Sequence, residues 1–167
     1  EEAGYKDGFE CTLYVKSTDS QTMMASQVLQ AYAAEVGVTV NLITLESTAL
    51  FAELYESKHD SYILTASNHD PYTGFVFFYG GTNPQAGNRM FYQNDRLDEL
   101  YELLPQTYDI DERQEMISEM QQIAVDDAVW VPLYGQSFYA AARKDVQGIR
   151  LDDLGWHNYA YAYAPLD

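Results

Sequence analysis

Apolar and polar residues alternate at the start of the chain, and this alternation predicts a strand over residues 11–17. Cys11, Leu13 and Val15 take every second position there, as in a strand that buries one face. A helix capped by Asp19 or Ser20 is expected next. Gly37 stands where the left-handed cap of that helix belongs. The apolar stripe of the helix is expected to comprise Met24, Val28, Ala31 or Tyr32, and Val36.

The β-branched and apolar run 38–45 predicts a second strand, which is buried. Strand, helix and strand with short joints form a parallel βαβ unit, expected to cross over right-handed. Ser47 is expected to cap the next helix, and residues 61–66 to form another short strand. The apolar face of that second helix is expected to hold Leu50, Phe51, Leu54 and Tyr55.

Residues 67–94 are rich in Asn, Gly and Pro and also in aromatic residues. So long an irregular stretch within one domain is more often functional than idle. A short helix or strand over residues 75–79 remains open. The stretch therefore marks the part of the chain where a binding role is first expected.

The second half of the chain predicts two helices followed by strands. The first helix begins at Asn94 or Asp95, and the second at Asp109 or Asp111. Residues 129–134 and 137–142 are expected to be strands, and the tail 159–163 alternates as a strand with one tyrosine face would. One face of the first helix is expected to hold Leu97, Leu100, Tyr101 and Leu104, and the second helix carries Arg113, Ile117, Met120 and Ala124 at helical spacing.

Composition supports a globular protein of 167 residues and disfavours some partners. Twenty-six acidic residues against nine basic ones give a formal net charge of −17, which disfavours nucleic acids and anionic membrane surfaces. Cys11 is the only cysteine, so an internal disulfide and a thiolate metal cluster are excluded. No apolar run approaches the length of about 20 residues that crosses a bilayer. No secretory leader is present either, and the chain is expected to begin partway through a larger protein.

Motifs for catalysis and metal binding are absent from the sequence. The segment 135–139 (GQSFY) lacks the second glycine of a nucleophile elbow, and the pair at 80–81 lacks the Gly-Lys-Ser/Thr of a phosphate loop. His59, His69 and His157 show no ligand spacing. No cofactor, no metal site and no catalytic residue are therefore predicted. A hydrolase with a non-local pair of carboxylates remains an alternative, since such a site leaves no local motif.

Six segments along the chain form an ordered set of motifs: 3–9 (AGYKDGF), 35–40 (EVGVTV), 88–100 (NRMFYQNDRLDEL), 111–126 with its Asp-Glu-Arg start, 131–134 (VPLY) and 146–148 (VQG). In this order they resemble family 5 of the extracellular solute-binding proteins, the peptide- and nickel-type receptors of ABC importers. The resemblance implies an α/β fold: a lobe of the type II periplasmic-binding-protein kind, with a mixed sheet, βαβ units and flanking helices. It implies that residues 1–167 are a single domain, the carboxy-terminal lobe of a two-lobed receptor.

The resemblance also implies a function and a location. A solute, such as a peptide, is trapped between the lobes, and the closed form is presented to a membrane ABC permease. The partners implied are the solute, the permease and the missing amino-terminal lobe in cis. The location implied is extracytoplasmic, in the periplasm or lipid-anchored at the cell surface. A scaffold or adhesin module that keeps the fold without transport is the alternative.

The binding site is expected beyond the carboxyl ends of the parallel strands, at residues 17–20, 45–48 and 65–72. The third segment gathers polar side chains beside an aromatic one. The predicted ligand-binding residues are Thr65, Ser67, Asn68, His69, Asp70 and Tyr72. Peptide-binding relatives carry a Trp and an Asp where Leu64 and Ser67 stand, so the resemblance leaves other solutes open, such as oligosaccharides or modified peptides.

Overall fold

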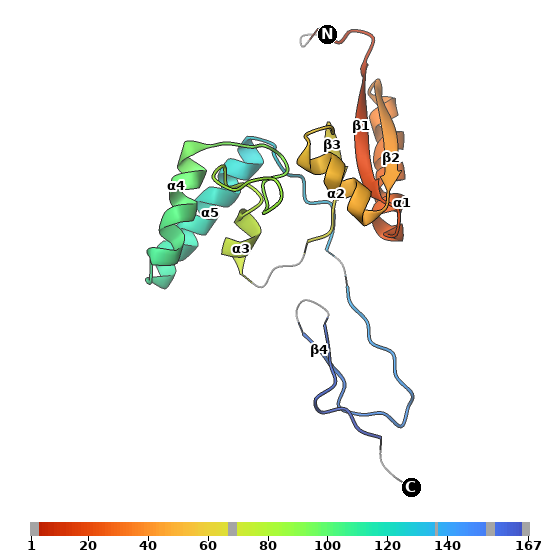
Figure 1. Ribbon diagram of the computed structural model, residues 1–167, viewed down its shortest axis with the longest axis vertical. Helices are drawn as coiled ribbons and strands as arrows, with labels where there is room; N and C mark the ends of the chain where they lie inside the picture. The colour runs from red at the N-terminus through yellow and green to blue at the C-terminus, as the bar shows by residue number, and fades with distance from the viewer. Residues whose placement is uncertain (1–3, 67–69, 136, 153–155, 165–167) are drawn as a thin grey trace. The chain divides into compact units, whose positions relative to one another are not determined.

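The computed structural model describes residues 4–66, 70–135, 137–152 and 156–164, and the side chain of His157 is left aside (Figure 1). The chain forms two compact units, which we describe separately. The first holds residues 1–66 and 76–98, and the second holds residues 67–75 and 99–167. Among the described helices, none combines the length and the apolar character needed to cross a bilayer.

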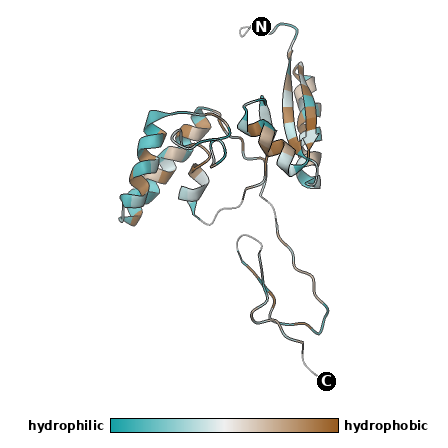
Figure 2. Cartoon of the chain, viewed as in Figure 1, coloured by the Kyte–Doolittle hydropathy of each residue, from teal (hydrophilic) through white to brown (hydrophobic). Residues whose placement is uncertain are grey.

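The core of the first unit is a parallel sheet of strands β1 (Phe9–Lys16), β2 (Val38–Leu45) and β3 (Ser61–Ile63). Its order is β2-β1-β3, so β1 pairs on both sides, and Lys16 lies opposite Leu45. Leu13, Val15 and Val40 form its buried cluster, and Figure 2 shows apolar residues recurring along β1 and β2. The predicted α/β class and the parallel βαβ unit are confirmed. Antiparallel pairing among the described strands occurs only between β4 (Arg150–Leu151) and β5 (His157–Asn158).

Two glycines at the start of the sheet have backbones that other residues adopt only with strain. Gly8 and Gly37 have φ angles of 82° and 84°, in the left-handed region that favours glycine. A Cβ on Gly8 would lie 1.8 Å from the carbonyl oxygen of Gly37. This close approach lets Phe9 N–H donate to the same oxygen at 3.3 Å and begin the pairing of β1 with β2. The predicted left-handed cap at Gly37 is confirmed.

Helix α1 (Ser20–Glu35) begins where predicted, but the face it buries is not the predicted one. Met24, Val28 and Tyr32 are 66%, 49% and 67% exposed, whereas Thr22 and Ser26 are buried. The Thr22 and Ser26 hydroxyls donate to the backbone carbonyls of Asp19 and Met23. Because each hydroxyl has a partner within its own helix, burying it costs little. The prediction of the buried stripe was therefore wrong.

Helix α2 (Ser47–Tyr55) buries Leu50 and Leu54, as predicted. Its cap position is held by Glu46, whose side chain makes no capping hydrogen bond, and Ser47 is the first helical residue. The Glu46 carboxylate instead accepts from the Ser17 hydroxyl at 2.9 Å. The expected role of Ser47 as the cap was therefore wrong. The strand that follows ends at Ile63, earlier than the predicted 66.

The remaining helices are α3 (Pro71–Phe75), α4 (Asp95–Leu103), a 3-10 turn (Leu104–Gln106) and α5 (Ile110–Asp126). Asn94 and Asp109 cap α4 and α5 through their side chains. The predicted face of α4 and of the turn after it is buried. It comprises Leu97, Leu100, Tyr101 and Leu104. In α5 the buried residues are Met116, Met120 and Ala124. Arg113 donates instead to the carbonyls of Leu104 and Thr107.

The predicted strands after residue 128 are wrong for the described residues. Segments 129–134 and 137–142 contain no strand, and a turn interrupts the tail at Ala160 and Tyr161. A strand forms only where another extended segment supplies its backbone hydrogen bonds. The alternation of apolar and polar residues does not show whether such a segment lies beside it. The three tail tyrosines, Tyr159, Tyr161 and Tyr163, are all exposed, so their alternation buries no face.

Candidate functional site

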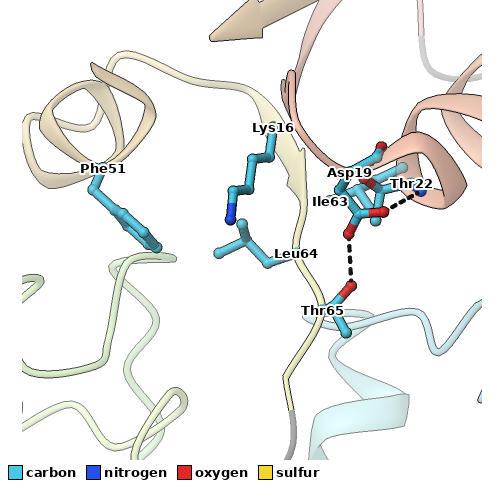
Figure 3. A pocket seen from close by; sticks show the side chains of 7 residues that line it. All are labelled: Lys16, Asp19, Thr22, Phe51, Ile63, Leu64 and Thr65. Atoms are coloured by element: carbon cyan, nitrogen blue, oxygen red, sulfur yellow. Dashed lines mark hydrogen bonds between the residues drawn. The ribbon is translucent and has the colours of Figure 1, made fainter. Parts of the chain in front are cut away.

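A pocket of about 130 Å³ opens at the carboxyl ends of β1 and β3, in the first unit (Figure 3). Because the strands are parallel, Lys16 at the end of β1 and Ile63 at the end of β3 reach the same edge of the sheet. This edge is where ligands of α/β sheets usually bind. The pocket is lined by Lys16, Asp19, Thr22, Phe51, Ile63, Leu64 and Thr65.

Both oxygens of the Asp19 carboxylate accept hydrogen bonds within the protein. One oxygen, Oδ1, accepts from the backbone N–H groups of Gln21 and Thr22, both at 3.1 Å, and caps α1. The other, Oδ2, accepts from the Thr65 hydroxyl at 3.1 Å, as the dashed line in Figure 3 shows. Burial opposes ionisation, but the hydrogen bonds from Thr22, Thr65 and Gln21 outweigh it, and the pKa of Asp19 lies below its ordinary value. This carboxylate therefore serves the fold and stays ionised.

Lys16 is the cation of the pocket. Its side chain is half-buried, and in Figure 3 it extends between Phe51 and the Asp19–Thr65 pair. Within the described part of the chain, Lys16 makes no ion pair. In a chain with a net charge of −17, a half-buried ammonium without a carboxylate partner is a natural receptor for an anionic group.

Phe51, Ile63 and Leu64 give the pocket an apolar wall. Phe51 projects from α2, one turn before Tyr55, and the two rings stack with centroids 6.0 Å apart. The pocket thus combines one positive group with an apolar surface, the pairing by which binding sites orient a small solute. It offers no pair of free carboxylates for acid–base catalysis among its lining residues.

The structure divides the predicted ligand-binding residues. Thr65 lines the pocket, whereas Ser67, Asn68 and His69 lie outside the described residues. Asp70 accepts from the backbone N–H of Tyr72 at 2.8 Å in the turn that opens α3. The Tyr72 ring stacks on Tyr101 at 4.5 Å. Both belong to the second unit.

Sequence reasoning did not select Lys16 or Phe51 for this site. Lys16 occupies a polar position of the strand pattern, and Phe51 an apolar position of a helix, so each has an ordinary structural explanation. The binding site is expected at residues 17–20, among other segments, and this expectation includes Asp19. Among the described residues, no group of three or more His, Cys, Asp or Glu side chains could hold a metal ion.

Comparisons with known proteins identify relatives of the chain. No protein-family model matches the chain. The glutathione-binding protein GsiB of Salmonella typhimurium is 25% identical over 157 residues, which cover 88% of this chain and 30% of GsiB. Among solved structures, the periplasmic binding protein DppA of Helicobacter pylori, in complex with the peptide STSA, matches with a TM-score of 0.67 and 25% identity. The match covers 79% of this chain and 26% of DppA. The chain is a homologue of these binding proteins.

A third comparison concerns the fold alone. The dipeptide-binding protein of a Pseudoalteromonas species, in complex with Met-Leu, matches 98% of this chain and 34% of its own, with a TM-score of 0.78 and 24% identity. The predicted resemblance to peptide- and nickel-type binding proteins is confirmed, as is the type II periplasmic-binding-protein fold. The chain spans about a third of the length of these relatives.

Proposed function

We propose that this chain is the carboxy-terminal lobe of an extracytoplasmic solute-binding protein of an ABC importer, and that it is not an enzyme. The observation that carries the proposal is the pocket at the carboxyl ends of β1 and β3. Homology to binding proteins, with the chain covering 30% of GsiB, supports the reading of residues 1–167 as one lobe. The ABC permease, the missing lobe and a location outside the cytoplasm, in the periplasm or lipid-anchored at the cell surface, are parts of the same proposal.

The pocket favours a solute that carries an anionic group. Lys16 is unpaired among the described residues, so a carboxylate placed beside it gains a charge-assisted hydrogen bond. Asp19 has little remaining capacity for a free amine, because its oxygens already accept three of the about four hydrogen bonds that a carboxylate can accept. The segment 65–72 supplies further polar groups in the proposal, as the sequence predicts. Peptides and related carboxylates are the solute class that fits.

The exposed apolar side chains of residues 129–163 support the one-lobe interpretation. They comprise Trp130, Val131, Leu133, Tyr134, Phe138, Tyr139, Leu151, Trp156, Tyr159, Tyr161 and Tyr163. So much aromatic and aliphatic surface within one stretch is unusual for a finished monomer. In the proposal, the remainder of the receptor covers part of this stretch.

The test uses the complete receptor purified gently from cells. Native mass spectrometry is expected to show a retained solute that is lost on denaturation and whose mass identifies its class. Lys16→Met is expected to weaken binding of that solute by about tenfold to a hundredfold, the cost of losing a hydrogen bond to a charged group. Lys58→Met is the matched control, since Lys58 pairs with Glu56 at the surface and does not line the pocket.

Two outcomes would contradict the binding site that this proposal assigns. Equal affinity of the folded Lys16→Met variant and the wild type would remove Lys16 from the site. Unchanged affinity of a folded Asn68→Ala, Asp70→Ala double variant would remove the segment 65–72 from it.

A further inference from the structure

Arg89 is held by aromatic rings and not by carboxylates. Its guanidinium carbon lies 5.0 Å from the ring centroid of Phe51, 5.7 Å from that of Tyr55 and 5.8 Å from that of Phe77. These distances are within the range of cation–π attraction. No ion pair of Arg89 occurs within the described part of the chain, although the sequence holds 26 acidic residues. The three rings are therefore the main partners of its charge.

The backbone around Arg89 is fixed, so the guanidinium is presented from a firm base. Asn88 is buried, and its side chain donates to the Tyr92 carbonyl at 2.7 Å and accepts from the Tyr92 N–H at 3.1 Å. The backbone N–H of Arg89 donates to the Gly87 carbonyl at 2.7 Å, and the side-chain Nη1 donates to the same oxygen at 3.4 Å. Gly87 is itself packed so closely that a Cβ there would lie 2.7 Å from the Val76 carbonyl oxygen. The turn at residues 87–92 thus has little freedom to move Arg89 away from the rings.

Phe51 connects this cluster to the pocket. It is the residue that both contacts the Arg89 guanidinium and lines the pocket beside Lys16. Tyr55 and Phe77 are not among the lining residues. The Arg89 Nε is buried and has no hydrogen-bond partner, and Nη1 has only a long bond of 3.4 Å to the Gly87 carbonyl, so contacts with the rings contribute much of what holds the guanidinium. Phe51 is therefore the residue that the Arg89 cluster and the pocket wall share.

We infer that Arg89 is a positioning residue for the solute pocket, which holds the Phe51 ring in the pocket wall through cation–π stacking. The inference rests on the proposed function only in taking the pocket as the place where the solute binds. A guanidinium is planar and stacks on a ring face, whereas an ammonium acts as a compact point charge. Lysine at position 89 is thus expected to hold the Phe51 ring in part, whereas an uncharged side chain of similar length is not expected to hold it.

The first test needs no ligand. The 167-residue chain is produced with ¹³C-labelled phenylalanine rings, and the Phe51 signal among the seven phenylalanines is assigned with Phe51→Leu. The wild type is expected to give one narrow Phe51 ring signal. Arg89→Met is expected to broaden or double it, and Arg89→Lys to restore a single line. Arg150→Met is the matched control, since Arg150 stacks on Tyr161 at 4.7 Å and Tyr161 does not line the pocket.

A narrow, single Phe51 signal in folded Arg89→Met would overturn the inference. If Arg89→Met does not fold, Arg89→Gln, which keeps a planar group without the charge, is read in the same way. The second test measures Met-Leu binding by the complete receptor. Arg89→Met is expected to raise the dissociation constant about threefold to tenfold, and Arg89→Lys to recover part of the loss. Absence of Met-Leu binding by the wild type would exclude this dipeptide as the solute and leave the lobe assignment to the mass-spectrometric test, while the ring signals would still decide the inference.

Discussion

The Thr65 hydroxyl donates a 3.1 Å hydrogen bond to the Asp19 carboxylate, joining residues 46 positions apart in the sequence. The same carboxylate caps α1 through Gln21 and Thr22. One side chain therefore fixes the start of a helix and the exit of β3 together, at the mouth of the pocket. A substitution at Thr65 therefore also acts on the residue that caps α1.

Asp19→Ala is expected to lower the free energy of unfolding by about 1–2 kcal/mol, since it removes a helix cap and leaves the Thr65 hydroxyl without its acceptor. Urea denaturation followed by circular dichroism measures this. Asp109→Ala is the matched control, because Asp109 caps α5 with the same two backbone contacts. Asp109→Ala is expected to lower the free energy of unfolding by less than Asp19→Ala does. Equal decreases in the two variants would show that the Asp19–Thr65 hydrogen bond adds no stability.

Lower pH is expected to destabilise the first unit through His59. Burial lowers the pKa of His59 more than the Arg89 backbone and Asp60 raise it. The unfolded chain therefore binds a proton more readily than the folded one, and stability is full above a pH of about 6.5 and falls as the pH drops below it. Asp19 and Asp60, whose pKa values lie below the ordinary value, lose their contributions only in more acidic solution.

The measurement is the melting temperature between about pH 8 and about pH 5. His59→Phe keeps a ring against Tyr14 and Tyr62 and removes the titrating group, so its melting temperature is expected to vary less over this range. A pH dependence identical to that of the wild type would assign the effect to other groups.

The buried face of α1 is tested by exchanging polarity on its two sides. Val28→Ser is expected to change the stability of this chain by less than about 0.5 kcal/mol, because Val28 is exposed. Ser26→Leu is expected to cost about 1–3 kcal/mol, because Ser26 is fully buried and a larger side chain has no room. Both values come from chemical denaturation. A larger loss of stability in Val28→Ser than in Ser26→Leu would instead support the buried face that the sequence predicts.

Salt is expected to stabilise the chain. A net charge of −17 repels itself in the compact state, and raising NaCl from about 0.1 M to about 1 M shortens the screening length from about 10 Å to about 3 Å. The melting temperature is therefore expected to rise. Glu115→Lys reverses one exposed charge of α5 and is expected to reduce the size of this rise. A melting temperature that does not depend on salt would mean that the charges are too far apart to matter.

The elements whose signals are local were predictable from the sequence. Asp19, Asn94 and Asp109 mark helix starts, and Gly37 marks a helix end, because caps depend on neighbouring residues alone. The buried side of α1 was not predictable, because Thr22 and Ser26 satisfy their hydroxyls within the helix and so lose the polar character that the pattern assigns them. The strands predicted after residue 128 were wrong, because the pairing of a strand depends on a partner elsewhere in the chain.

The pocket was predictable only in position. Parallel strands bring their carboxyl ends to one edge, so residues 17–20 and the start of 65–72 were expected there. That Lys16 is the unpaired cation, and that Phe51 forms the wall with Arg89 against it, depends on distances that no local pattern encodes.

The order β2-β1-β3 leaves one edge of β2 and one edge of β3 without a described neighbour. The β2 segment, VTVNLITL, carries no charged residue over its eight positions, and natural proteins usually protect such edges with charge, proline or a covering element. When this chain is produced by itself, β2 is the segment expected to recruit a strand from a second molecule and begin precipitation. A lysine at an exposed β2 position, such as Asn41→Lys, is the change that would keep concentrated samples in solution.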